Sequence, residues 1–314
     1  MIPTLNLKDF TKGTTESRQK FVQDLGQAYE KIGFVAIQNH ELEDAFIAEL
    51  YAAVKKFFDL PDATKKKYER EDLAGQRGYT GKLKEHAKDQ TVADLKEFYQ
   101  IGQELENPEV YGYPANVWPE EVPEFKPLAI QCYRKLEAIG RQMLRAIALY
   151  LDLPEDYFED KVHHGNSILR AIHYFPLKDI EIEPGAVRSA AHEDINLITL
   201  LIGASAAGLQ VLTRDGQWID ITAIPGTIVV NVGDMLQRLT NNKLRSTTHR
   251  VVNPPAELAH TARYSIPFFL HPKSDMDLSC LPSCITEDNP KQYEDITAGE
   301  YLRQRLIEIG LLKV

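Results

Sequence analysis

The second half of the chain consists of short apolar or alternating runs separated by turn-forming residues, and no other feature constrains the fold more. The runs cover 167–174, 197–202, 209–212, 217–219, 228–232, 247–252 and 263–270. Gly, Asp, Asn and Pro stand between them, as in Asp215-Gly216 and Pro225-Gly226. Strands that are this short and this closely spaced are typical of an all-β sandwich or barrel rather than of βαβ units.

Helical periodicity dominates the flanks of this β region. Apolar residues recur with three-four spacing over 17–32, 45–58 and 127–151, which predicts amphipathic helices, and 301–312 has the pattern of a last helix. We therefore expect an α+β protein with a mostly β core and helical flanks. No flexible linker divides the chain, so we also expect a single cooperative unit.

The charge balance and the cysteine content narrow the choice of partners and compartment. The net charge is −10, from 46 acidic and 36 basic residues, so nucleic acid is not an expected partner. No apolar run approaches the roughly 18–20 residues that a membrane helix needs, so no membrane partner is expected either. The N-terminus has no signal-peptide pattern, and Cys132, Cys280 and Cys284 do not suggest a disulfide framework, which together favour the cytoplasm.

The β region contains His192-Glu193-Asp194 and, later, His249. On an extended chain residues i and i+2 point to the same face, so His192 and Asp194 can converge on one metal ion while Glu193 points away. His249 would supply a third ligand from a neighbouring strand. Two imidazoles and one carboxylate leave coordination positions open, which suits an iron(II) ion that must also take up a chelating cosubstrate and dioxygen.

Arg263 and Ser265 stand on a later predicted strand and also share one face. A buried guanidinium needs a carboxylate, and beside a metal ion it matches the distal carboxylate of a small dicarboxylic acid. Taken singly, each motif has an ordinary structural explanation, because His and Asp are common at surfaces and Arg263 can form a structural ion pair. The ordered combination within one strand-rich region is what favours a functional site.

This ordered set resembles the signature of the iron(II)/2-oxoglutarate-dependent dioxygenases of the isopenicillin N synthase-like branch, which is His-x-Asp, a distant His and Arg-x-Ser. Segments 33–37, 77–79, 94–99, 208–211 and 231–234 are also similar to that family, so the resemblance covers nearly the whole chain. It implies a double-stranded β-helix (jelly roll, cupin-like) catalytic core at 166–272. The implied flanks are an N-terminal dioxygenase region of helices and short strands at 1–110, a connecting helical segment at 111–165, and a C-terminal segment with a helix at 273–314.

The resemblance implies that His192, Asp194 and His249 bind iron(II), and that Arg263 and Ser265 bind the C5 carboxylate of 2-oxoglutarate, with dioxygen as the other cosubstrate. The family often places a Tyr just before a Pro on the preceding strand, where the Tyr meets the cosubstrate.

The segment Tyr174-Phe175-Pro176 allows two alignments with that family pattern. Tyr174 takes the Tyr place when the segment is counted from Arg170, whereas Phe175 takes it when the segment is counted back from Pro176. We favour Tyr174. If Phe175 faces the site instead, His173 on the same face would donate the hydrogen bond, unless His173 is a core histidine.

The implied reaction oxidises, by default hydroxylates, a small-molecule C–H bond and yields succinate and carbon dioxide. An isopenicillin N synthase-like iron oxidase that does not use 2-oxoglutarate stays open, because that enzyme also carries Arg-x-Ser. A catalytically silent small-molecule binding protein on the same fold is the alternative from another class. By analogy with the family, the loop 75–88 with Arg77 and Tyr79, and the segments around Phe98 and Phe269, line the substrate pocket. The sequence predicts neither the substrate nor the oligomeric state.

Overall fold

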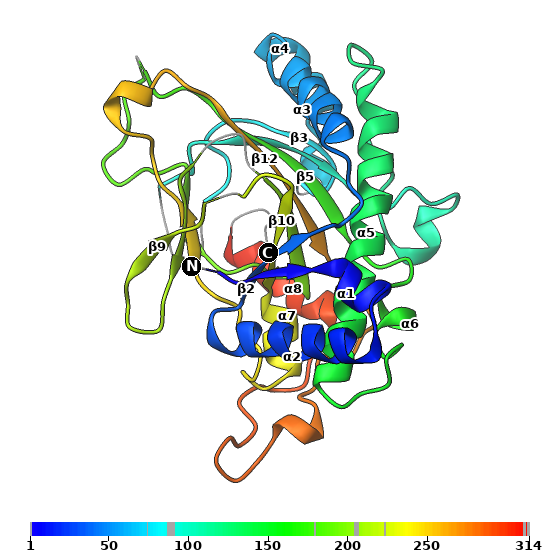
Figure 1. Ribbon diagram of the computed structural model, residues 1–314. Coiled ribbons are helices and arrows are strands. Elements are labelled where there is room, and N and C mark those ends of the chain that lie inside the picture. The colour runs from blue at the N-terminus through cyan, green and yellow to red at the C-terminus, as the bar shows by residue number, and fades with distance from the viewer. Residues whose placement is uncertain are drawn as a thin grey trace.

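The strands of the protein form two sheets (Figure 1). The computed structural model describes residues 2–73, 75–86, 92–178, 180–203, 207–222, 224–309 and 312. Its larger sheet has eight strands in the order β1-β2-β10-β7-β12-β5-β4-β3, and its smaller sheet has four in the order β6-β11-β8-β9. The strands β1 to β4 from the first third of the chain extend the same sheet that the later strands build, so the two parts share one core.

In the second half of the chain the bounds of the strands follow the predicted runs closely. The strands are β1 (Thr4–Asn6), β2 (Phe34–Gln38), β3 (Gly78–Thr80), β4 (Glu97–Ile101), β5 (Ile168–Tyr174), β6 (Ser189–His192), β7 (Ile198–Ile202), β8 (Leu209–Leu212), β9 (Trp218–Asp220), β10 (Thr227–Val232), β11 (His249–Val251) and β12 (Arg263–Leu270). Every run predicted in the second half overlaps a strand. Strand β6 was not predicted as a separate run.

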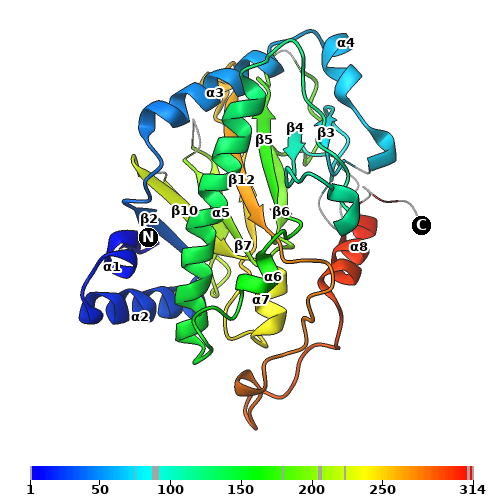
Figure 2. The ribbon, with the colours of Figure 1, turned by 90° about the vertical axis from the view of Figure 1, so that its right-hand side faces the viewer.

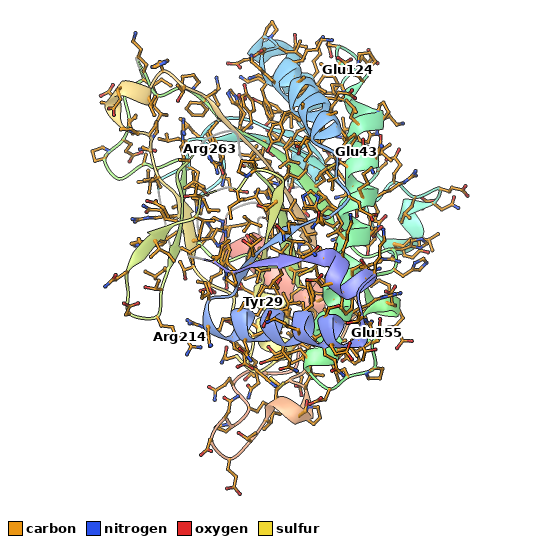
Figure 3. All side chains as sticks on the ribbon, in the orientation of Figure 1. Tyr29, Glu43, Glu124, Glu155, Arg214 and Arg263 are labelled. Carbon is orange, nitrogen blue, oxygen red and sulfur yellow. The ribbon has the colours of Figure 1, made fainter. Side chains whose placement is uncertain are left out.

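The helices flank the two sheets. They are α1 (Leu7–Thr11), α2 (Thr15–Lys31), α3 (Asp44–Phe58), α4 (Asp62–Lys65), α5 (Phe125–Tyr150), α6 (Glu159–Val162), α7 (Asp234–Leu239) and α8 (Ala298–Glu308). Helix α2 begins at an N-cap, where the Thr14 side chain accepts a hydrogen bond from the backbone N–H of Ser17. Its inner face carries Tyr29, which is fully buried (Figure 3). None of the helices in the described part of the chain has the length and apolar character needed to cross a membrane.

Side chains alternate between the two faces of the large sheet. On β12 the odd-numbered side chains from Arg263 to Phe269 line a cavity between the two sheets, whereas the even-numbered ones from Tyr264 to Leu270 pack in the main hydrophobic core. On β5 the even-numbered side chains from Ile168 to Tyr174 line the same cavity. This period of two is a property of any extended chain, so the register of each strand decides which residues reach the cavity.

Helix α5 covers the outer face of the large sheet (Figure 2). Its inward stripe includes Leu136, Met143 and Ile147, which are almost completely buried. Burial of each such side chain stabilises the fold by about 1.5–3 kcal/mol. At Gly140 the helix packs tightly against β12, because an added Cβ would lie 2.3 Å from Cδ1 of Leu270.

The substitution Gly140→Val should therefore overpack the interface between α5 and β12. We expect it to lower the free energy of unfolding by about 1–3 kcal/mol, measured by urea denaturation. Ala138→Val places the same side chain on the exposed face of the same helix, so it should lower the free energy of unfolding by well under half as much. Equal losses from the two substitutions would contradict the close packing at Gly140.

Candidate active site

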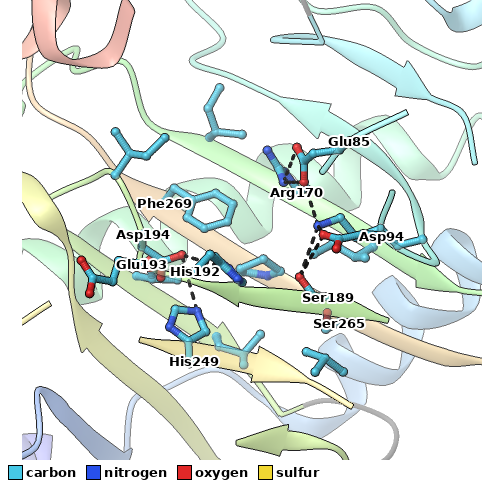
Figure 4. Close-up of a pocket in the computed structure, with 18 of the residues that line it drawn as sticks. Glu85, Asp94, Arg170, Ser189, His192, Glu193, Asp194, His249, Ser265 and Phe269 are labelled. Atoms are coloured by element: carbon cyan, nitrogen blue, oxygen red, sulfur yellow. Dashed lines mark hydrogen bonds and ion pairs between the residues drawn. The ribbon is translucent and has the colours of Figure 1, made fainter. Parts of the chain in front are cut away.

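The cavity between the two sheets has a volume of about 200 Å³. That is below the range of about 300–1,000 Å³ that is usual for ligand pockets, so it suits small ligands. Side chains of β5, β7 and β12 from the large sheet and of β6, β8 and β11 from the small sheet line it, together with part of α8 (Figure 4).

A group of two imidazoles and one carboxylate lies at one end of this cavity. His192 ends β6, His249 begins β11, and the antiparallel register sets these two residues directly opposite each other. Asp194 follows β6 by two residues. The ligand atoms of the three side chains all lie within 4.8 Å of one another.

Both histidines are oriented by their own strands. Nδ1 of His192 lies 2.7 Å from the carbonyl oxygen of Ala190, and Nδ1 of His249 lies 3.0 Å from that of Thr247. A carbonyl oxygen can only accept, so each Nδ1 carries the hydrogen and each Nε2 presents its lone pair to the cavity. Enclosure in the pocket and the neighbouring His249 lower the pKa of His192 to about 4, so this imidazole is neutral at pH 7.

Asp194 is held through one of its two oxygens. Its Oδ2 accepts hydrogen bonds from Oγ1 of Thr199 at 2.7 Å and from Nδ2 of Asn231 at 2.8 Å. Burial alone would raise the pKa of Asp194, but the two nearby histidines and the two hydrogen bonds outweigh it, and the net shift is downward. Asp194 is therefore a carboxylate at neutral pH, and its Oδ1 is directed toward the histidines.

The three side chains fit a divalent metal ion. Oδ1 of Asp194 lies 3.9 Å from Nε2 of His192 and 3.7 Å from Nε2 of His249. These distances are too long for hydrogen bonds. They are short enough for one ion to bridge both pairs with bonds of about 2.0–2.2 Å. Two imidazoles and one carboxylate on one side of an ion leave the opposite positions open for other ligands.

Arg263, Ser265 and Tyr174 line the same cavity as the three metal-ligand candidates. Arg263 is 2% exposed, and its guanidinium carbon lies 4.9 Å from the centre of the Tyr174 ring. The two residues are direct partners in the pairing of β12 with β5. Phe175 does not line the cavity; it packs in a small apolar cluster with Leu95. Of the two alignments of this segment, the structure has the one in which Tyr174 faces inward.

His173 was expected to contact the cosubstrate only if Phe175 faced the site. It lies on the opposite face of β5, outside the cavity, as the core-histidine alternative has it. Its Nδ1 lies 2.7 Å from Oε1 of Glu97, and its ring stacks on Tyr264 at 4.8 Å. Strand alternation is the reason, because Tyr174 points into the cavity and its neighbour must therefore point out.

Of the four residues predicted to line the substrate pocket, only Phe269 does so among the described residues. Arg77 is completely buried elsewhere, against Gly102. Tyr79 donates a hydrogen bond to Glu97 and packs in the main core. Phe98 lies beneath the guanidinium of Arg170, at 4.3 Å from the ring centre. Residues 87 and 88 of the predicted loop lie outside the described residues.

Several polar residues that line the cavity were not predicted individually. They are Glu85, Asp94, Lys96, Arg170 and His271. A usable signal existed for Arg170, which stands two and four residues before Ile172 and Tyr174 and so shares their face. His271 stands two residues after Phe269 and had the same signal, whereas the positions of Glu85, Asp94 and Lys96 depend on contacts between distant segments.

Helix α8 closes one side of the cavity. Leu302, Leu306 and Ile309 are among its lining residues. The helix begins with a capping box, in which Thr297 and Glu300 exchange hydrogen bonds between side chain and backbone. Tyr301 of this helix donates a hydrogen bond to Asp234 at 3.0 Å, and the backbone N–H of Asp234 in turn donates to the carbonyl oxygen of Asp194.

Two family models match this chain. Residues 2–121 match the N-terminal domain of the non-haem dioxygenases in morphine synthesis. Residues 165–272 match the 2OG-Fe(II) oxygenase superfamily.

Curated relatives align over nearly the full length of both chains. The proline hydroxylase buaE of Petromyces alliaceus is 34% identical, over 98% of this chain and 99% of its own. The 2-oxoglutarate-Fe(II) type oxidoreductase hxnY of Emericella nidulans is 30% identical, over 96% of this chain and 88% of its own.

Solved structures share the fold. A 2OG-Fe(II) oxygenase family protein from Caulobacter crescentus is 43% identical, with a TM-score of 0.86 over 98% of this chain and 99% of that chain. A full-length protein from Neurospora crassa, crystallised with alpha-KG and thymine, is 32% identical, with a TM-score of 0.87 over 98% of this chain and 96% of that chain. The expected jelly-roll architecture with helical flanks is thus confirmed.

The hydrogen bond from Thr199 to Asp194 should support metal affinity. Thr199→Val keeps the shape of the side chain but removes the donor, so we expect the affinity for manganese(II), measured by anaerobic calorimetric titration, to fall about 10- to 100-fold. Thr222→Val, at an exposed position, is the matched control and should leave the affinity unchanged. An unaltered affinity in the Thr199 variant would mean that Asp194 does not need this contact.

Proposed function

Because this chain belongs to the 2OG-Fe(II) oxygenase superfamily, whose members use iron(II), 2-oxoglutarate and dioxygen, we propose that it hydroxylates a C–H bond of a small molecule. In the balanced reaction, the substrate, 2-oxoglutarate and dioxygen give the hydroxylated product, succinate and carbon dioxide. One oxygen atom enters the product and the other enters succinate. The relatives support a small-molecule substrate, since one is named a proline hydroxylase and another was crystallised with thymine.

In this proposal His192, Asp194 and His249 hold the iron. The observation that carries the assignment is the convergence of their three ligand atoms within 4.8 Å at one end of a cavity. When bound, iron(II) supplies the redox chemistry that couples decarboxylation of 2-oxoglutarate to oxidation of the substrate. The chain contributes orientation, since hydrogen bonds with Ala190, Thr247, Thr199 and Asn231 hold the three ligand side chains in place.

Arg263, Ser265 and Tyr174 would bind 2-oxoglutarate. A guanidinium and a hydroxyl two residues apart on β12 share the inward face, and together they can donate to one carboxylate. The ring of Tyr174 packs against the guanidinium and limits its movement. Because Arg263 is almost completely buried, its attraction for a carboxylate is weakly screened by solvent.

The remaining walls would exclude water from the reacting centre. Apolar side chains of Ile168, Ile195 and Leu201 from the sheets and their connections line the cavity together with Leu306 of α8. This enclosure would protect the oxidising step from bulk solvent. The two alternatives drawn from the sequence are not favoured, because the relatives are named as 2-oxoglutarate-Fe(II) oxidoreductases and the cavity contains a complete set of ligand candidates.

Succinate formation from 2-oxoglutarate with added iron(II) tests the metal assignment. Asp194→Ala removes the only carboxylate of the ligand group, so we expect succinate formation to fall at least about 100-fold. Asp288→Ala, at an exposed site, should retain the wild-type rate. A rate in the Asp194 variant equal to that of the wild type would refute the assignment.

The dependence of the rate on 2-oxoglutarate tests the role of Arg263. Arg263→Met should raise the KM for 2-oxoglutarate about 10- to 100-fold, because a charge-assisted hydrogen bond is worth roughly 1.5–3 kcal/mol. Arg134→Met changes an exposed arginine of α5 and should have no effect. If the rate of oxygen consumption by the wild-type enzyme does not depend on the concentration of 2-oxoglutarate, the oxidase alternative would replace this proposal.

A further inference from the structure

One wall of the cavity is a chain of charges of alternating sign, of which Glu85, Asp94 and Lys96 are buried and Arg170 is half-buried (Figure 4). Nζ of Lys96 lies 2.7 Å from Oδ2 of Asp94 and 2.7 Å from Oε1 of Glu85. Glu85 in turn pairs with Nη1 of Arg170 at 3.2 Å. The wall therefore contains two carboxylates and two cations, and its charges cancel.

Most of the hydrogen-bonding capacity of this wall is used internally. The three contacts of Lys96 to Asp94, Glu85 and Ser189 use its three donors. Oδ1 of Asp94 accepts from the backbone N–H of Ala190 at 2.9 Å. Although burial opposes ionisation, Arg170 and Lys96 hold the pKa of Glu85 at about 2, so the carboxylate stays charged at neutral pH.

Arg170 is the member of the wall that retains a donor for a ligand. Its Nε donates to Oε1 of Gln100 at 2.9 Å, and its Nη1 donates to Glu85. Within the described part of the chain, Nη2 has no hydrogen-bond acceptor. The guanidinium is fixed over the ring of Phe98 and lies 5.3 Å from the ring centre of Phe269, which also lines the cavity.

His271 adds a second polar group to this part of the cavity. Its side chain is buried and lines the cavity, and its Nδ1 has no hydrogen-bond partner among the described residues. Burial lowers the pKa of His271 to about 4, so the imidazole is neutral at pH 7. A neutral imidazole offers one N–H donor and one acceptor nitrogen, and it adds no charge to the wall.

We propose that the primary substrate is an uncharged small molecule with a flat amide-type group, such as a lactam, an imide or a pyrimidine base. Its carbonyl oxygen accepts from Arg170, its second polar atom meets His271, and its flat face lies on Phe269. This substrate class rests on the proposed function. A carboxylate at the same place would approach Glu85 and Asp94 without an additional cation to balance it, so an anionic or zwitterionic substrate is disfavoured.

Substrate-stimulated succinate formation tests the substrate class with matched probes. Thymine and 2-pyrrolidinone are the uncharged probes, orotate is a pyrimidine that carries a carboxylate, and L-proline is a zwitterion. We expect at least one uncharged probe to stimulate succinate formation at least about 10-fold over the rate without substrate, and neither charged probe to do so.

Variants of the polar groups test the contacts. Arg170→Met and His271→Phe should each raise the KM for the stimulating probe about 10- to 100-fold, because a hydrogen bond to the substrate is lost. Arg134→Met is the control and should not change it. A melting curve for each variant establishes that it is folded. His271→Gln keeps polar atoms in the side chain, so it should raise the KM less than His271→Phe does.

The outcomes separate this inference from the proposed function. The substrate class is wrong, and the proposed function stands, if only orotate or L-proline stimulates succinate formation. The same conclusion follows if no uncharged probe stimulates succinate formation while the enzyme turns over 2-oxoglutarate without substrate. An unchanged KM in folded Arg170→Met would also overturn the inference. If 2-oxoglutarate neither binds nor turns over in the presence of iron(II), the proposed function itself fails.

Discussion

The pairing of β11 with β6 is the interaction on which the candidate site depends. It sets His249 opposite His192, and it brings both imidazoles to the end of the cavity where Asp194 is held by Thr199 and Asn231. These strands have only three and four residues. A shift of one residue in their register would turn His249 to the other face of the sheet, so a small part of the ladder determines whether three ligands can meet.

The alternation of side chains between the two faces of a strand explains which site residues could be predicted from the sequence. His192 with Asp194, and Arg263 with Ser265, stand at i and i+2, and this spacing puts each pair on one face without knowledge of the fold. The sequence could not decide whether Tyr174 or Phe175 faces the cavity, because this depends on which residue of β5 pairs with Arg263 across the sheet. That pairing turns His173 outward, to Glu97, and removes it from the cavity.

The remaining features depend on contacts between segments that are distant in the chain. Glu85 and Arg170 are 85 positions apart, and Lys96 meets Ser189 across 93 positions. Analogy with the family assigned Arg77 to the pocket, but the space beside Gly102 accommodates its side chain in the interior instead. A wall whose charges cancel gives the cavity polarity without net charge, and this is why we propose a substrate that is selected by hydrogen bonding and shape rather than by charge.

A crystal structure of the protein with manganese(II) and 2-oxoglutarate, both added without oxygen, tests the central claim most directly. We expect one ion bonded by Nε2 of His192, Oδ1 of Asp194 and Nε2 of His249, with the distal carboxylate of 2-oxoglutarate on Arg263 and Ser265. An ion bound at other residues, or a 2-oxoglutarate carboxylate on Arg170 instead of Arg263, would contradict the site described above.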